Sequence, residues 1–292
     1  MAAAQSLRRP SAEYTTARLL KLGRRAIFYA AVLLLVVFYL FPTLYVLSTS
    51  LKLPVDYFTI PPHWIPSSLT LANYEKMFVD YQAGTALANS LFIATLNTVV
   101  TLIMSIPVAY AIARYKVGGG ALGFWIISQR MLPAVAIVIP FFLTFRALNL
   151  INTYHGMIIA YALFFIPFAV WILLGFFEDF PQEIQDAALI DGCSELGTIV
   201  RIVIPILAGS IFVVALLLFV FTWNDLLIAL VLTRAETRTM MVFFSATLVS
   251  PTQQDYGVAA GAVVVGMIPA YLFAVLGQRY LVRGLTMGGL KG

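Results

Sequence analysis

The chain alternates between long apolar runs and shorter polar connections. A helix rises about 1.5 Å per residue, so about 20 apolar residues cross the hydrocarbon core of a bilayer, which is roughly 30 Å thick. A transmembrane β-barrel would instead need segments of about ten residues that alternate between apolar and polar. Six continuous runs have the required length: residues 26–48, 88–112, 121–145, 156–177, 204–232 and 258–277. The pattern predicts an all-α integral membrane protein with six transmembrane helices.

Two features of these runs bear on their shape. Prolines fall inside several of them, and membrane helices tolerate proline better than soluble helices do. The fifth run, 204–232, is long enough either to tilt in the bilayer or to contain a break. The connections 49–87 and 233–257 are expected to be loops on one side of the membrane, the second of them polar and containing Pro251.

The Lys and Arg residues between the runs predict the orientation. Twelve lie on the side of the two termini and five on the opposite side. Because cytoplasmic loops carry the excess of Lys and Arg, both termini are expected in the cytoplasm. The chain then divides into a cytoplasmic tail (1–25), a six-helix transmembrane domain (26–277) and a second cytoplasmic tail (278–292). The first run is longer than the apolar core of a signal peptide and no small-residue cleavage motif follows it, so we expect a retained anchor.

Composition narrows the class of protein further. Hydrophobic residues make up 61% of the 292 residues and charged residues 11%, against about 45–50% and about 25% in soluble proteins. This argues against a water-soluble enzyme, a disordered chain or a nucleic-acid-binding protein; we expect lipid contact and no nucleic-acid partner. The net charge of +5 forms no single patch. The lone Cys193 cannot form an internal disulfide, and no Cys/His cluster has metal-ligand spacing.

The cytoplasmic connection 178–203 holds six of the 13 acidic residues and predicts a short exposed helix. Pro181 suits the first helical position, Gly192 a helix end, and Ser194 the cap of a second short helix. Four residues with helical spacing share one face: Ile184, Ala187, Ala188 and Asp191. A helix lying on lipid would carry basic residues on its polar face, whereas this one is acidic. We therefore expect it to dock against another protein.

The same connection carries a recognisable motif. Asp186-Ala187-Ala188, followed by Gly192 and later by Ile202 and Pro205, resembles the EAA loop of ATP-binding-cassette importer permeases. Asp stands where that family has Glu, and the motif lies in the last cytoplasmic loop but one, as the family requires. Further segments resemble the carbohydrate-importer branch (MalG-like, maltose-type permeases) over almost the whole chain: Ser50-Leu51-Lys52, Trp64-Ile65-Pro66, Asn89-Ser90, Ala113-Arg114, Arg130-Met131-Leu132-Pro133, Trp223-Asn224-Asp225 and Arg279 to Thr286.

The resemblance implies an importer of the type I fold in the cytoplasmic membrane of a bacterium or archaeon. It implies a second homologous permease subunit, two cytoplasmic ATPase subunits, an extracytoplasmic substrate-binding protein and a sugar substrate. Asp186 takes the place of the Glu that pairs with a basic group on the ATPase, and Glu183 is a second candidate. The expected ATPase-docking residues are Glu183, Asp186, Ala187, Ala188, Asp191, Gly192, Arg201 and Pro205.

The energy source is expected to lie outside this chain. No G-x-x-x-x-G-K-[ST] phosphate-binding loop occurs in the sequence. The chain is therefore expected to bind no cofactor and to catalyse no reaction, with ATP and Mg²⁺ on the partner ATPase.

Two charged residues lie deep within the predicted runs. Arg130 is near the middle of the third run, where a central Arg costs about 2.5–3.5 kcal/mol on insertion scales and needs a partner or a wet cavity. Asp225 in the fifth run is the only acidic residue at comparable depth. They either pair with each other or line the substrate route and bond sugar hydroxyls, and a pair could be purely structural. Asn224 and Asn89 are also candidates to face this route.

The apolar runs, the acidic cytoplasmic helix and the family resemblance together favour a sugar-importer permease subunit. An importer of a polyol, a sugar phosphate or a glycerol phosphodiester remains an alternative. An intramembrane enzyme would need a clustered nucleophile, base or metal site, which we do not find. A secondary transporter would usually show inverted repeats and would leave the acidic cytoplasmic helix without a purpose.

Overall fold

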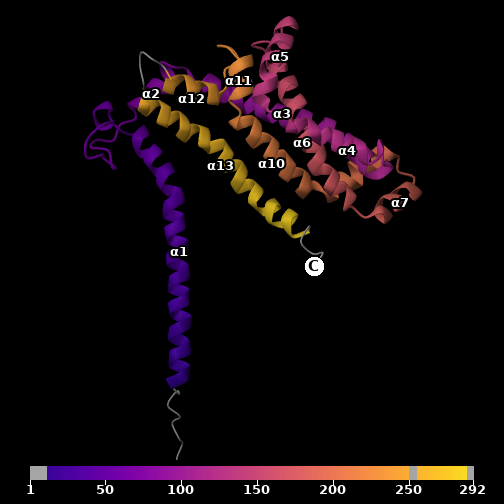
Figure 1. Cartoon of the computed structure of the whole chain (residues 1–292), viewed down its shortest axis with the longest axis horizontal. Coiled ribbons are helices and arrows are strands. Elements are labelled where there is room, and N and C mark those ends of the chain that lie inside the picture. The colour runs from indigo at the N-terminus through magenta and orange to yellow at the C-terminus, as the bar shows by residue number, and fades with distance from the viewer. Residues whose placement is uncertain (1–11, 250–254, 288–292) are drawn as a thin grey trace, which may run out of the picture.

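The structure is a computed structural model that describes the backbone of residues 12–249 and 255–287 and the side chains of residues 21–248 and 255–278. The described backbone is helical, with no strand in these ranges. In chain order the helices are α1 (Ala12–Ser50), η1 (Pro54–Asp56), α2 (Ala72–Val79), α3 (Ala83–Tyr115), α4 (Gly119–Ser128), η2 (Gln129–Met131), α5 (Ala134–Ala147), α6 (Tyr154–Glu178), α7 (Gln182–Ile190), α8 (Glu195–Thr198), η3 (Ile199–Val203), α9 (Ile204–Ile206), α10 (Ala208–Asn224), α11 (Leu227–Leu232), α12 (Met240–Val249) and α13 (Tyr256–Met287) (Figure 1).

Four helices are long and apolar enough to cross a membrane. They are α3, α6, residues 21–50 of α1 and residues 256–278 of α13. Two bent pairs qualify only if each pair is one crossing: α4–η2 with α5, and α8–α9 with α10. The described chain therefore has four to six candidate crossings. Helix α1 begins at Ala12, inside the expected tail 1–25, and α13 continues to Met287. The expected tail residues 1–11 and 288–292 lie outside the described residues.

The expectation of one continuous helix over 121–145 is wrong. Helix α4 leads into the tight η2 turn, and α5 leaves it at 90°. Leu132 and Pro133 at the bend have extended backbone, with ψ of 124° and 128°. Proline lacks an N–H and disfavours helical backbone at the residue before it, so the helix ends there.

The fifth run, 204–232, contains breaks rather than one tilted helix. A bend of 82° separates α8–α9 from α10, and Asp225, whose ψ is 127°, separates α10 from α11. The expected polar loop 233–257 needs a correction as well, because the apolar helix α12 occupies much of it. Met240 and Phe243 of α12 are buried in a cluster that includes Val258 of α13. Pro251 lies outside the described residues.

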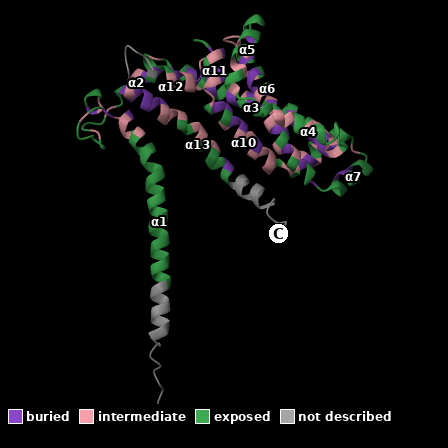
Figure 2. Cartoon of the chain, in the orientation of Figure 1, coloured by how far each residue is buried: buried purple, intermediate pink, exposed green. Residues whose placement is uncertain are grey.

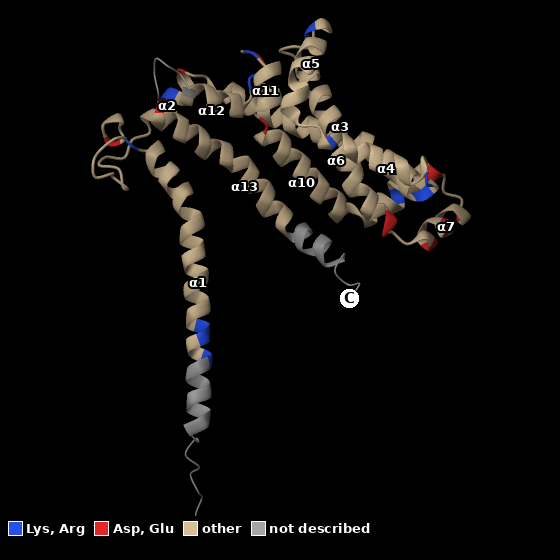
Figure 3. Ribbon diagram, viewed as in Figure 1, with Lys and Arg blue, Asp and Glu red and all other residues tan. Residues whose placement is uncertain are grey.

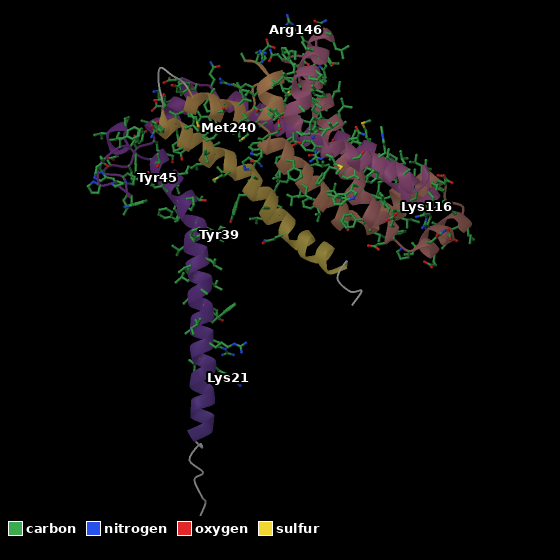
Figure 4. All side chains as sticks on the ribbon, viewed as in Figure 1. Lys21, Tyr39, Tyr45, Lys116, Arg146 and Met240 are labelled. Carbon is green, nitrogen blue, oxygen red and sulfur yellow. The ribbon has the colours of Figure 1, made fainter. Side chains whose placement is uncertain are left out.

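Helices α3 and α6 form the centre of the bundle and run in the same direction. Near their first residues Tyr154 of α6 contacts Asn89 of α3, and near their last residues Phe177 packs on Tyr110. Helix α10 runs the opposite way beside α3, where Asn97 donates a hydrogen bond to Thr222 at 2.7 Å. The bundle therefore has two ends. The α7 end contains α7, α8 and the turn 116–118; the α12 end contains residues 51–82, 148–153 and 233–249. Lys116 lies at the first and Met240 and Arg146 at the second (Figure 4).

Helix α1 meets the bundle only at the α12 end and then stands away from it (Figures 1 and 2). Its apolar side chains from Ile27 to Phe41 are exposed in the isolated chain. A contiguous apolar surface of this length is typical of a contact with lipid or with another protein.

Candidate functional site

Helix α7 forms as its sequence predicts. Pro181 precedes the helix as its N-cap residue instead of occupying the first helical position, with an extended ψ of 128°. The helix ends before Gly192, whose φ of +86° lies in the left-handed region that favours glycine. Ser194 then caps α8 by accepting a hydrogen bond from the Gly197 amide at 3.1 Å. The predicted stop at Gly192 and the predicted cap at Ser194 are confirmed.

The two faces of α7 differ sharply in exposure. Gln185 and Ala188 are 3% exposed and face the bundle, as expected for residues spaced i, i+3. The other expected docking residues are exposed: Glu183, Asp186, Ala187, Asp191, Gly192, Arg201 and Pro205. The expectation that Ala188 belongs to the outward surface is therefore wrong. Successive residues of a helix point about 100° apart, which places Ala187 outside and Ala188 inside.

The exposed face of α7 is acidic (Figure 3). The two salt bridges among the described residues join His63 to Asp56 and Lys76 to Asp255, both at the α12 end. Glu183, Asp186 and Asp191 thus have no salt-bridge partner within the described chain. Exposed carboxylates that lack an internal cation suit a basic partner surface.

A contact that the sequence analysis missed holds α7 to the bundle. The Arg114 Nε at the last turn of α3 donates a short hydrogen bond to the Gln185 amide oxygen. Tyr115 interacts with Gln185 of α7 and with Glu195 of α8. The only sequence signal for this contact was a polar residue three positions before Ala188 on the inward face, and naming its partner required the fold.

The charged residue Arg130 lies in η2, at the bend before Pro133. Its Nη1 donates a hydrogen bond to the Phe164 carbonyl oxygen at 3.1 Å. Its guanidinium carbon lies 5.7 Å from the Phe165 ring centroid and 5.4 Å from that of Phe168. Cation–π contacts of this kind stabilise a guanidinium away from water, and here they are supplied by α6.

Asp225 occupies the break between α10 and α11. Its Oδ2 accepts hydrogen bonds from the Tyr161 hydroxyl at 3.0 Å and from the amides of Ile228 and Ala229 at 3.0 and 3.2 Å. The carboxylate thereby satisfies two amides in the first turn of α11, which no backbone carbonyl within that helix can reach. The aspartate therefore both fixes the helix start and anchors Tyr161 of α6.

Arg130 and Asp225 do not form the hypothesised ion pair, since no salt bridge joins them in the described chain. They instead border one cavity of about 350 Å³ together with Asn224, Phe165 and Phe221. Asn224 also borders a larger, mainly apolar cavity of about 700 Å³ between α1, α10, α12 and α13. The alternative hypothesis, that both charges line a route, remains a prediction.

Asn89 lies elsewhere, which corrects its expected place beside this route. It is at the α12 end, where its Nδ2 donates to the carbonyl oxygens of Glu236 and Arg238 at 2.9 and 3.0 Å. Its Oδ1 accepts from the Tyr154 hydroxyl at 2.7 Å. With both ends of its amide bonded and 6% exposure, Asn89 fastens the 233–239 loop to α3 and α6.

In the described ranges, no three His, Cys, Asp or Glu side chains lie close enough together to hold a metal ion. The arrangement instead consists of an exposed acidic helix at one end, a folded loop region at the other and cavities at the helix breaks between them. Discontinuous helices that border cavities are found at the substrate sites of many membrane transporters.

Comparison with known proteins identifies the family. Residues 105–287 match the model of the binding-protein-dependent transport system inner membrane component, and the chain belongs to this family. It is 36% identical to the sulfoquinovosyl glycerol transport system permease protein SmoH of Agrobacterium fabrum, covering 87% of this chain and 89% of that one. It is also 36% identical to the trehalose transport system permease protein SugB of Mycobacterium tuberculosis, covering 92% and 99%. A crystal structure of a bacterial ABC transporter that imports the acidic polysaccharide alginate contains a similar chain, with 25% identity, a TM-score of 0.75 and coverage of 88% and 96%.

Proposed function

We propose that this chain is the transmembrane permease subunit of an ATP-driven importer that takes up a sugar or sugar derivative delivered by an extracytoplasmic binding protein. The exposed acidic face of α7, with the EAA-type pattern at Asp186, Ala187 and Gly192, is the observation that carries the proposal. The transported compounds in the names of its relatives, sulfoquinovosyl glycerol and trehalose, support a carbohydrate.

The orientation follows from charge. We place the α7 end and both termini in the cytoplasm and the α12 end outside, with six crossings that count each bent pair as one. Two ATPase subunits then bind the permease pair from the cytoplasm, one of them at α7, and the binding protein docks at the α12 end. The exposed apolar side of α1 contacts lipid and a second, homologous permease subunit.

The mechanism assigns the chemistry and the movement to different chains. ATP and Mg²⁺ bind to the ATPase, and the sequence of this chain contains no phosphate-binding loop motif. Closure of the ATPase subunits displaces α7, and the helices attached to it change their arrangement around the substrate path. Alternating access of this kind needs only that ATP binding favours one of two arrangements by a few kcal/mol.

Within the path, Arg130 and Asn224 are the candidates to bond sugar hydroxyls. Arg130 uses one of its N–H groups for Phe164 and Asn224 donates to the Val220 carbonyl oxygen at 2.8 Å, so both retain further hydrogen-bonding capacity toward the cavity. Asp225 is more constrained, because one of its oxygens holds Tyr161 and the α11 amides.

Purification in mild detergent tests the assignment. The tagged chain is expected to recover a cytoplasmic ATPase and a second permease, both identified by mass spectrometry. Gly192→Asp, which places a side chain at the +86° φ that ends α7, is expected to lose the ATPase. Recovery of the chain alone, equally folded in both forms, would contradict the proposal and favour a secondary transporter.

The substrate class is tested by reconstitution. The purified complex with its binding protein is supplied with ATP and labelled trehalose, sulfoquinovosyl glycerol, a polyol or a glycerol phosphodiester. Uptake of one of the two sugars supports the proposal, while uptake of the polyol or the phosphodiester alone identifies the alternative importer class.

A further inference from the structure

Helix α3 is held by polar contacts at both of its ends. At the α7 end, Arg114 donates through Nε to Gln185, which is 3% exposed on the inward face of α7. In the described chain this is the one hydrogen bond that Arg114 donates, and its buried Nη2 has no hydrogen-bond partner there. Arg114 and its neighbour Tyr115, which also interacts with Gln185, thus attach the inward face of α7 to α3.

The opposite end of α3 holds the 233–239 loop. Asn89 donates to the carbonyl oxygens of Glu236 and Arg238, and the Ser90 hydroxyl accepts from the Met240 amide at 2.7 Å. These bonds are buried or partly buried, so water does not compete freely for them. The loop and the start of α12 therefore follow any displacement of this end of α3.

Helix α3 is one continuous helix of 33 residues that contains both sets of contacts. At about 1.5 Å per residue it spans roughly 50 Å. It packs along α6 through the central core and is tied to α10 by the Asn97–Thr222 hydrogen bond. The neighbouring segments α4–α5 and α8–α10 are bent by 90° and 82°, whereas α3 continues without a break through Pro107.

We propose that α3 transmits movement between the ATPase-docking helix α7 and the outside loop 233–239, with Arg114 and Gln185 as the positioning residues that link α7 to it. The proposal rests on the proposed function, because it supplies the route by which ATP closure on one side reaches the binding-protein side. The Asn89 contacts form the second link of the same route.

The transmission from α7 to the 233–239 loop can be tested on the chain without its partners. Hydrogen exchange is followed by mass spectrometry on the full chain in detergent, for the wild type, Gln185→Leu and the control Gln182→Leu, which changes an exposed glutamine of the same helix. Gln185→Leu is expected to speed exchange in α7 and also in residues 233–239, whereas Gln182→Leu leaves both near wild type. Faster exchange confined to α7 would overturn the transmission.

A second experiment tests coupling in the assembled transporter. Gln185→Leu is expected to retain the ATPase and its ATP turnover but to lower sugar import per ATP by about tenfold, because a hydrogen bond to a charged group contributes about one decade to an equilibrium constant. Gln185→Glu keeps an acceptor for Arg114 and is expected to stay within about twofold of wild type. Wild-type import per ATP in Gln185→Leu would overturn the proposal.

A double variant distinguishes the loss of these two links from a general loss of stability. If they act in series, Asn89→Leu lowers import per ATP, and the double variant with Gln185→Leu is no worse than the more severe single variant. Independent structural damage would instead multiply the two losses. A wild-type complex that binds no ATPase contradicts the proposed function itself, and the hydrogen-exchange result then decides the transmission on its own.

Discussion

Two carboxylates at the α12 end are bonded within the chain, whereas those on the exposed face of α7 have no salt-bridge partner among the described residues. At the α12 end Asp56 is 4% exposed and accepts from the Ser67 hydroxyl at 2.6 Å and from the Ser67 amide at 3.1 Å, with His63 Nδ1 at 3.2 Å. Asp255 there accepts from Lys76 at 2.9 Å and Tyr81 at 2.5 Å. At the α7 end Glu183, Asp186 and Asp191 are exposed and form no salt bridge within the described residues.

The difference shows which surface is complete by itself. Carboxylates that are bonded internally stabilise a loop region and leave little charge for a partner. Carboxylates left in solvent contribute little to folding and remain available for association. The α12 end is therefore a preformed surface, and the α7 end is one that a partner completes.

The largest expected effect is the loss of stability when an internally bonded carboxylate of the α12 end is removed. Asp255→Ala removes the acceptor of both Lys76 and Tyr81, which join α2 and the segment before α3 to the start of α13. We expect it to lower the free energy of unfolding by about 1–2 kcal/mol, allowing for partial solvent screening. Asp186→Ala at the α7 end is expected to change it by less than about 0.5 kcal/mol. Thermal unfolding of both variants in one detergent measures the difference, and equal losses would contradict it.

The second largest expected effect is that acid loosens the loop region 51–71 at the α12 end. The Ser67 hydroxyl and amide lower the pKa of Asp56 below its ordinary 3.8, although burial opposes the shift. A carboxylate with a lowered folded-state pKa stabilises the fold above its unfolded value, and this contribution disappears as the pH falls through the folded value. Loop 51–71 should stay ordered down to about pH 4 and loosen below it, as followed by Trp64 fluorescence.

Ser67→Ala sharpens this test. Loss of its hydroxyl raises the Asp56 pKa toward the ordinary value, so the loosening should begin at a higher pH than in the wild type. An unchanged midpoint would show that Ser67 does not control the carboxylate.

The smallest expected effect is spectroscopic. The hydrogen bond to Asp255 is the largest cause that raises the pKa of Tyr81, which reaches about 12. A raised tyrosine pKa stabilises the fold below pH 10, and that stabilisation is lost as the pH rises toward 12. Asp255→Asn removes the negative acceptor and should lower the Tyr81 pKa, as read by phenolate absorbance against a Tyr81→Phe blank. Identical titrations in the two forms would exclude the contact.

Local sequence signals predicted the parts of the fold that depend on neighbouring residues. The apolar runs, the glycine stop at Gly192 and the cap at Ser194 need only the adjacent chain. The position of the bends did not follow, because Pro107, Pro140 and Pro167 continue inside helices whereas Pro133 ends one. Helix α12 was missed because its ten residues, although mostly apolar, are too few to cross a bilayer.

The same distinction between local signals and long-range contacts applies to the candidate site. Small residues give α7 no apolar contrast, so Ala187 and Ala188 could not be assigned to opposite faces without the bundle. Asn89 and Gln185 owe their roles to partners 147 and 71 residues away. Asp225 bonds Tyr161 and two amides of α11 and not Arg130, the first of its two hypothesised roles. Long-range pairing decided each case, and periodicity carries no information about it.

We propose above all that the acidic face of α7 binds the ATPase through carboxylates that have no salt-bridge partner within the described residues. The direct measurement is the amount of ATPase recovered with Asp186→Lys, compared with Asp80→Lys, which makes the same charge change at an exposed site of the α12 end. The account predicts that Asp186→Lys loses most of the ATPase and that Asp80→Lys recovers as much as the wild type. Equal recovery by the two variants, or loss in Asp80→Lys alone, would contradict it.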